Sequence, residues 1–318
     1  MEEKQIDKWL RRQFSVTGWT LIAYLGIMNL LVMLSMALAA LRQVCRAAAA
    51  QNFGFTMDLA AIQGDAWGYI LTIAVGFMVL WAWKGGDFWK EEILAKERPM
   101  GLPDFFYLLC LCIGAQFVND FWIGLLETVL NWFGLSAMAA MEAVSGASDT
   151  FSMFLYASIL GPIAEEMLYR GLILRTLRPF GKRFAILTSA ILFGMYHGNL
   201  LQTPCAVVLG LVFGYAAAEY SIWWSIALHI FNNLVLADLL TRLTAPLPEA
   251  MASVVILGIF GAFALAGAVI LICRRRQIGE YHRSEWMDRR CLKCFFTNSG
   301  VLTFLALTAA SMICLLFV

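Results

Sequence analysis

Charged side chains are scarce in this sequence. Asp, Glu, Lys and Arg account for 14% of its 318 residues, whereas apolar residues account for 61% and the mean hydropathy is +0.74. Long apolar runs recur along the chain, so the composition excludes an ordinary soluble domain and predicts a polytopic membrane protein. Basic and acidic residues nearly balance, and the formal net charge of +1 gives no reason to expect a nucleic-acid partner.

Histidines and paired cysteines are also rare, which limits the metal chemistry open to the chain. There are three histidines and no HExxH motif, in which two histidines bind zinc and the glutamate stays free. Cys291 and Cys294 form a lone CxxC in the basic segment RRCLKC, and without a second pair they do not indicate a zinc or redox site. The cysteines inside apolar runs are expected to be buried thiols: Cys110, Cys112, Cys205, Cys273 and Cys314.

Apolar runs of membrane-spanning length predict the fold class. A helical span needs about 20 apolar residues, and nine candidates follow one another: 16–41, 66–84, 104–124, 151–174, 184–198, 204–220, 222–241, 251–273 and 299–318. The fifth is short. The first is longer than the roughly 7 to 15 apolar residues of a signal peptide, so we expect an uncleaved span. The sequence therefore predicts an all-α, polytopic helical membrane protein with about eight or nine transmembrane helices.

Basic residues mark alternate connections between these spans. They gather before the first span, after the second (85–102), after the fourth (175–183) and after the eighth (274–298). The opposite connections are poor in basic residues: 125–150 and 199–203 have none, and 42–65 has only Arg42 and Arg46. Because cytoplasmic loops carry the excess of Lys and Arg, we expect the N-terminus and these basic segments to be cytosolic. The turn near Ser221 should lie on the same side, although it carries no basic residue.

The stretch GPIAEEMLYRG, residues 161–171, places three charged side chains inside an apolar run. Each such charge costs about 2.5 to 3.5 kcal/mol at the centre of a membrane helix, so it must pair, face water or do chemistry. Glu166 and Arg170 are four residues apart and can pair on one helix face. Glu165 then remains the unpaired carboxylate, about 100° round the helix. Pro162 should break the helix just before it and free the carbonyl of Ser158, four residues earlier.

Two further spans carry polar residues at comparable depth. His197 ends the fifth span, and the seventh contains LHIFNNL with His229, Asn232 and Asn233. His229 and Asn233 are four residues apart and should present together, while Asn232 points elsewhere. We expect one polar cavity within the bilayer to gather Glu165, His197, His229 and Asn233. The nearby GLVFG, residues 210–214, has the spacing of small residues that lets two helices pack closely.

Several chemistries suit this set of side chains. A carboxylate and an imidazole can hold and deprotonate a water, while imidazole and amide N–H groups can donate to a developing oxyanion. That is sufficient to hydrolyse an acyl bond without a covalent nucleophile. The same glutamate and two histidines could instead bind zinc, serve as a proton relay in a transporter, or hold the helices together. The residues alone leave these alternatives open.

Three motifs in order also resemble a known family. EEMLYR matches EExxxR, FGMYH matches FxxxH and HIFNN matches HxxxN, each inside an apolar span. In this arrangement the chain resembles the CPBP family of intramembrane endopeptidases, which includes the type II CAAX prenyl proteases and bacterial proteins linked to bacteriocin processing and self-immunity. The resemblance divides the chain into N-terminal transmembrane helices (1–125), a CPBP-like catalytic core (150–240) and C-terminal transmembrane helices with a basic cytosolic loop (250–318).

The resemblance implies a role for each motif residue. Glu165 would be the general base with help from His197, and His229 and Asn233 would stabilise the oxyanion. We expect Glu166 and Arg170 to give structural support, because their spacing allows a pair. A CPBP-like enzyme would need no cofactor, with one zinc as the alternative.

The same resemblance implies where the protein acts and on what. It indicates an integral protein of a bacterial cell membrane and a membrane-associated peptide or protein as substrate. A non-catalytic role, as a bacteriocin immunity partner or a transporter, is the alternative, and the intact motif set favours the enzyme. Substrate identity and oligomeric state are not indicated.

Overall fold

The computed structural model describes residues 3–51, 54–138, 150–285 and 287–317 as helices joined by short connections. No strand occurs among these residues; the one β-bridge joins Lys96 to Ser221. The predicted all-α, polytopic fold class is confirmed. Part of the predicted 125–150 connection, residues 139–149, lies outside the described residues.

The first helices in the described part of the chain are α1 (Glu3–Ala49), α2 (Leu59–Gln63), α3 (Trp67–Asp87), the π-helical η1 (Phe88–Ile93) and α4 (Leu102–Trp132). Three of them, α1, α3 and α4, are long, and α2 and η1 are short. The next rod changes register repeatedly: α6 (Phe151–Leu155), η3 (Tyr156–Leu160), α7 (Gly161–Glu166), η4 (Met167–Leu174), α8 (Arg175–Leu177) and the 3₁₀ turn η5 (Arg178–Phe180). Here η3 and η4 are π-helical. We call residues 151–177 the glutamate rod.

The remaining helices complete the bundle. They are α9 (Lys182–Tyr196), α10 (Thr203–Glu219), α11 (Ile222–Ile230), the π-helical η6 (Phe231–Leu239), α12 (Leu240–Thr244), α13 (Glu249–Cys273), α14 (Arg275–Ser284), α15 (Arg289–Phe296), α16 (Ser299–Cys314) and the 3₁₀ turn η7 (Leu315–Phe317). Six segments in the described part of the chain are long and apolar enough to cross a membrane: 3–49, 59–93, 102–132, 222–244, 249–273 and 299–317. The predicted fourth, fifth and sixth spans correspond to the interrupted glutamate rod and to the shorter helices α9 and α10.

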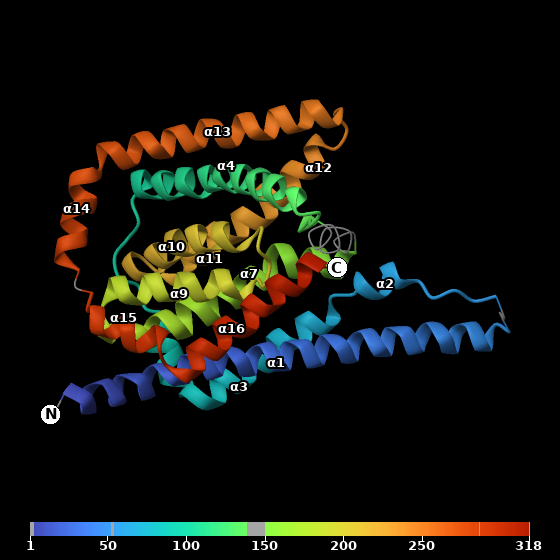
Figure 1. The fold of residues 1–318 in the computed structure, drawn as a ribbon, viewed down its shortest axis with the longest axis horizontal. Helices are drawn as coiled ribbons and strands as arrows, with labels where there is room; N and C mark the ends of the chain where they lie inside the picture. Colours follow the sequence, from blue (N-terminus) through green and yellow to red (C-terminus); the bar gives the residue numbers. More distant parts are fainter. Residues whose placement is uncertain (1–2, 52–53, 139–149, 286, 318) are drawn as a thin grey trace.

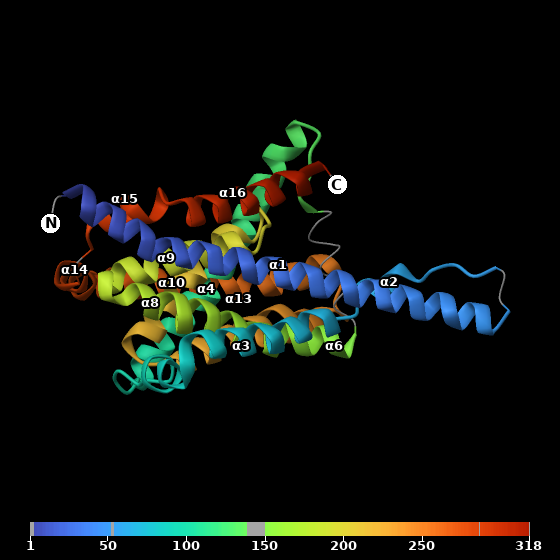
Figure 2. The same ribbon diagram turned by 90° about the horizontal axis from the view of Figure 1, so that it is seen from below.

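These shorter helices form the centre of the molecule. Figure 1 shows α9, α10 and α11 in the middle of the bundle, with α4 and α13 on one side and α1, α3 and α16 on the other. Residues of the glutamate rod and of α9 dominate the largest buried cluster, which α1, α15 and α16 also enter. Figure 2 shows α1 running between α16 and α3, and its C-terminal half extends past the bundle together with α2.

The predicted basic connections meet at one end of the bundle. The N-terminus, α14 and α15 lie at the left of Figure 1, and Figure 2 shows α8 at the same end. Ion pairs tie these segments together: Arg175 to Glu97 at 2.8 Å, Lys182 to Glu219 at 2.9 Å and Arg290 to Asp7 at 2.5 Å. The turn at Ser221 joins them, because the Glu97 N–H donates to the Tyr220 carbonyl. The predicted same-side grouping is thus confirmed, although which side of a membrane it faces stays a prediction.

One expectation at this end is wrong. Residues 274–298 were expected to form a loop, but most of them form α14 and α15. The side chains explain why: α15 buries Cys291, Cys294 and Phe295 in the main core, while its Arg290 reaches Asp7 of α1. The CxxC cysteines are therefore buried parts of an amphipathic helix and not members of an exposed basic loop.

Candidate active site

A π-helical register breaks the glutamate rod just before its two glutamates. The Gly161 N–H donates to the carbonyl of Tyr156, five residues back, instead of four. In this register residue 162 would donate to the carbonyl of Ala157, but Pro162 has no N–H. The Ala157 carbonyl accepts instead from Asn233 Nδ2 at 2.9 Å. The helix continues through Pro162, and the predicted interruption takes the form of a π-helical register, which moves the freed acceptor from the expected Ser158 to Ala157.

The predicted pair between Glu166 and Arg170 forms at the centre of the site. Arg170 Nη1 donates to Glu166 Oε1 at 2.9 Å, and neither side chain is exposed. The guanidinium carbon lies 4.3 Å from the ring centre of Phe193 and 5.5 Å from that of Phe213. Its Nη2 donates to the carbonyl of Gly210 at 3.1 Å. A buried pair of this kind is tolerated because both charges find partners.

Gly210 is a close-approach position for this arginine. A Cβ atom there would lie 3.0 Å from Ala190 Cα and 3.2 Å from Arg170 Nη2. The small-residue spacing at 210–214 therefore packs α10 against α9, as predicted, and also opens a carbonyl to the buried guanidinium.

Glu166 has two further partners that complete its hydrogen bonding. The Ser225 hydroxyl contacts Glu166 Oε2, and His229 Nδ1 lies 2.8 Å from Oε1. The sequence motifs do not contain Ser225. Its spacing could have indicated it, because Ser225 precedes His229 by four residues and so shares its helix face.

His229 lies between the two glutamates. Since Glu166 is paired with an arginine and acts as an acceptor, His229 Nδ1 must carry a proton. In the neutral imidazole Nε2 then has a free lone pair, and it faces Glu165 Oε2 at 3.7 Å. The ring stacks on Phe213 at 4.8 Å between centres and meets the edge of Phe193 at 5.6 Å. Hydrogen bonding and packing together fix both the tautomer and the orientation of the imidazole.

Glu165 differs from its neighbour because it opens into a crevice. Its side chain keeps 22% of its surface exposed, whereas that of Glu166 is fully buried. The crevice is narrow, with a volume of about 10 Å³ available to the centre of a water molecule. We call it the tyrosine crevice; it is lined by Tyr24, Met28, Tyr69, Thr72, Ile73, Tyr156, Gly161, Ala164, Glu165 and Tyr196.

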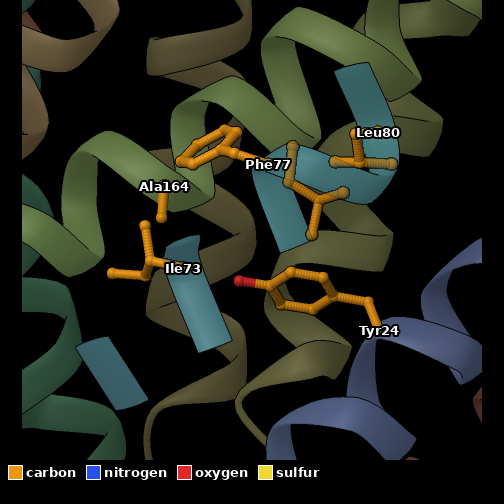
Figure 3. A pocket seen from close by; sticks show the side chains of 6 residues that line it. Tyr24, Ile73, Phe77, Leu80 and Ala164 are labelled. Carbon is orange, nitrogen blue, oxygen red and sulfur yellow. The ribbon is translucent and has the colours of Figure 1, made fainter. Parts of the chain in front are cut away.

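Helices α1 and α3 supply one wall of the tyrosine crevice. Tyr69 stacks on Tyr156 of the glutamate rod with ring centres 4.8 Å apart. Figure 3 shows the adjoining apolar pocket, where the Tyr24 hydroxyl points toward Ile73 and Ala164. Sequence reasoning found no motif in these helices, and tyrosines in apolar spans give no signal that separates lining residues from packing residues.

His197 lies at the end of α9. The helix ends there because Gly198 adopts a φ of +57°, a left-handed conformation that glycine adopts at low cost. His197 Nδ1 is 2.9 Å from the Phe193 carbonyl, and its ring meets Phe193 edge-on at 4.9 Å. Phe193 therefore contacts both imidazoles. Among the described residues no hydrogen bond or ion pair joins His197 to Glu165.

Asn233 faces the same glutamate rod as His229, as its spacing predicted. His229 meets the rod at Glu165 and Glu166, and Asn233 meets it about two turns earlier at Ala157. Asn232 turns toward α4, as its spacing predicted: its Oδ1 accepts from Gln116 Nε2 at 2.6 Å, and its Nδ2 donates to Asn233 Oδ1 at 3.0 Å. Both asparagines lie in the π-helical segment Phe231–Leu239.

The alternative zinc set is not assembled in this arrangement. Glu165 and His229 are neighbours, whereas the contacts of His197 in the described structure are with Phe193 and Tyr196. In residues 3–51, 54–138, 150–285 and 287–317, no group of three His, Cys, Asp or Glu side chains is placed to hold a metal ion.

Comparison with known proteins gives one match. Residues 147–235 match the family model described as "Type II CAAX prenyl endopeptidase Rce1-like". The matched segment contains all six predicted site residues: Glu165, Glu166, Arg170, His197, His229 and Asn233. No curated protein and no solved structure matches this chain. The match supports the family resemblance that the three motifs predict.

Proposed function

We propose that this chain, whose residues 147–235 match the Rce1-like model of type II CAAX prenyl endopeptidases, hydrolyses a peptide bond of a membrane-associated protein or peptide with water activated by Glu165 and His229. The bond broken is the amide C–N bond. One product keeps the new carboxylate and the other the new amine.

The observation that carries this proposal is the difference between the two adjacent glutamates. Glu166 is fully buried, and its carboxylate accepts hydrogen bonds from Arg170, Ser225 and His229. Glu165 opens into the tyrosine crevice and has one imidazole nitrogen 3.7 Å away. That separation is too long for a direct hydrogen bond, and a water between the two groups would complete it. Glu165 is thus the carboxylate placed to hold a nucleophilic water.

The first chemical step is attack of that water on the substrate carbonyl. The water donates one hydrogen to Glu165 and the other to the lone pair of His229 Nε2, which leaves its own lone pair for the carbonyl carbon. A proton passes to one of these two bases as the new C–O bond forms. His229 can accept it, because the carboxylates of Glu165 and Glu166 flank the imidazolium.

The second step needs donors for the oxyanion and for the leaving amine. An imidazolium at His229 has an Nε2–H to donate, so the oxyanion role implied by the resemblance follows its role in activating water. Asn233 has two amide hydrogens, and its bond to Ala157 uses one. The second hydrogen is free for the oxyanion. The protonated base then gives its proton to the leaving nitrogen as the C–N bond breaks.

His197 has a supporting role in this scheme. With Nδ1–H donating to the Phe193 carbonyl, its Nε2 keeps a lone pair. Its edge contact with Phe193 connects it to the ring that also supports His229 and Arg170. We assign His197 a positioning role, through its edge contact with the Phe193 ring that also supports His229.

The proposal is tested with purified protein in detergent micelles and two internally quenched peptides. One carries a farnesylated cysteine three residues before its C-terminus, and the other is the same peptide with a free cysteine. We expect cleavage of at least one peptide, with activity that survives thorough chelation and sub-stoichiometric zinc in the protein. One tightly bound zinc per chain, with activity lost on its removal and restored on its return, would make Glu165 and His229 ligands instead of bases.

A non-catalytic role would give a different result in these experiments. If neither peptide nor a broad set of membrane peptides is cleaved, and cells carrying Glu165→Gln protein are still protected from a bacteriocin, the chain acts by binding. A Glu249→Gln variant is the matched control, because Glu249 is exposed in the first turn of α13, away from the site.

A further inference from the structure

A chain of three amide hydrogen bonds leads from α4 to the glutamate rod. Gln116 Nε2 donates to Asn232 Oδ1 at 2.6 Å, and Asn232 Nδ2 donates to Asn233 Oδ1 at 3.0 Å. Asn233 Nδ2 then donates to the Ala157 carbonyl at 2.9 Å. Every bond in this chain runs in the same direction, from the Gln116 side to the Ala157 carbonyl.

The direction of these three hydrogen bonds decides which end of the Asn233 amide faces the glutamate rod. An asparagine side chain can turn over, which exchanges its oxygen for its nitrogen. Because Asn232 donates to Asn233 Oδ1, turning Asn233 over would place two NH₂ groups against each other. It would also set the Asn233 oxygen against the Ala157 carbonyl. Asn232 keeps its own orientation because its Oδ1 accepts a hydrogen bond from Gln116 Nε2.

We propose that Gln116 and Asn232 are positioning residues that hold the Asn233 amide with its NH₂ toward the reacting carbonyl. The inference rests on the proposed function, since it assumes that Asn233 donates to the oxyanion. One hydrogen of the Asn233 amide bonds to the Ala157 carbonyl, which Pro162 leaves without a helical donor. The other hydrogen is held at a fixed place for the substrate. Gln116 lies on α4, outside residues 147–235. Part of the positioning of Asn233 therefore comes from outside the segment that matches the family model.

Geometry favours positioning over simple helix packing. Gln116 and Asn232 are half-buried, and their direct partners are amides, with no charged group between them. Neutral hydrogen bonds between membrane helices add little to stability. A donor lost from an oxyanion site lowers turnover by about 100- to 1000-fold. The larger effect is therefore expected on catalysis.

The test is a double-mutant cycle on turnover of the cleaved quenched peptide. Gln116→Met removes the donor at similar length, and we expect kcat to fall about 3- to 10-fold with KM changed less than 2-fold. In an Asn233→Ala background, Gln116→Met should change kcat less than 2-fold, because no amide remains to orient. Asn232→Ala should likewise lower kcat about 3- to 10-fold in the otherwise wild-type protein and less than 2-fold in the Asn233→Ala background. Asn119→Leu, on the same helix α4, is the control, since its buried Oδ1 has no partner in the described structure.

The possible outcomes distinguish a failure of the positioning role from a failure of the proposed function. Equal falls in kcat in both backgrounds, or a change limited to KM or to melting temperature, would overturn the positioning role. An Asn233→Ala enzyme that loses turnover while Gln116→Met matches wild type would also overturn it and leave the proposed function intact. If Asn233→Ala itself keeps wild-type turnover, the oxyanion assignment fails first. A loss of fold in one variant is identified by melting temperature, and the cycle with Asn232→Ala then decides.

Discussion

At the scale of single residues, the two adjacent glutamates have different roles in the site: Glu166 is buried and paired, and Glu165 is partly exposed. Spacing alone predicted that Glu166 would pair with Arg170 and leave Glu165 unpaired, and the structure has that arrangement. Spacing could not predict the second half of the Glu166 environment. Ser225 and His229 come from a helix about 60 residues away in sequence, and their contacts depend on how α11 packs against α7.

Ser225→Ala should reduce both stability and turnover. The buried carboxylate of Glu166 would lose a hydrogen bond, and bonds to charged groups are worth about 1.5 to 3 kcal/mol. His229 would also lose part of its fixed partner. Melting temperature and kcat are the measurements. Ser152→Ala, which removes a buried hydroxyl from the Ala66 N–H, should lower melting temperature alone. Equal effects of both variants on kcat would show that Ser225 has no special relation to the site.

At the scale of helices, π-helical segments place the polar groups. The glutamate rod and the α11–η6 helix both leave the regular α-helical register where they face each other. Sequence reasoning recognised the interruption at Pro162 but assumed α-helical bonding, so it chose Ser158 instead of Ala157. Register shifts depend on the packing of neighbouring helices, which spacing within one helix does not contain.

Pro162→Ala should lower turnover without lowering stability. An alanine N–H at 162 can donate to the Ala157 carbonyl in the existing register, so it competes with Asn233 for that acceptor. Asn233 would then be less well fixed, and we expect kcat to fall about 10-fold, a small part of the loss seen when an oxyanion donor is removed. Melting temperature should stay equal or rise. Pro204→Ala in the first turn of α10 is the control, because no N–H is needed there. A drop in melting temperature with unchanged kcat would contradict this account.

At the scale of the whole molecule, the basic connections form one end of the bundle. Their alternation along the chain predicted this grouping correctly, because charge bias is a property of sequence. The fold of 274–298 into α14 and α15 was missed, since its core contacts lie with α1 and the α8–α9 region. The long projection of α1 beyond the bundle was also not predicted from its apolar run.

Single cysteines in a cysteine-free variant will locate this end relative to the membrane. Positions 90 and 180 are expected to resist a membrane-impermeant thiol reagent in intact cells and to react after lysis. Residue 200, in the 199–203 connection at the opposite end, should react without lysis. Strong labelling at 90 or 180 in intact cells would reverse the orientation.

Acid should weaken the basic end through Glu97. Hydrogen bonds from Arg178 first, and then from Arg175, lower the pKa of Glu97 from its ordinary value to about 2. A carboxylate with a depressed folded-state pKa contributes stability above its ordinary pKa near 4.5, and that contribution is lost as pH falls toward 2. Melting temperature in detergent should fall between pH 5 and pH 3 in the wild type and fall less in Glu97→Gln. Parallel pH profiles for the two proteins would remove Glu97 from this role.

The most direct test of the central claim compares Glu165→Gln with Glu166→Gln for turnover and melting temperature in one preparation. Glu165→Gln removes the proposed base and leaves the buried pair intact, so kcat should fall at least 100-fold at wild-type melting temperature. Glu166→Gln leaves Arg170 buried without its counter-charge. Breaking such a pair costs about 3 to 5 kcal/mol in soluble proteins, so both quantities should fall. Near-native turnover in folded Glu165→Gln protein would contradict the assignment of Glu165 as the base.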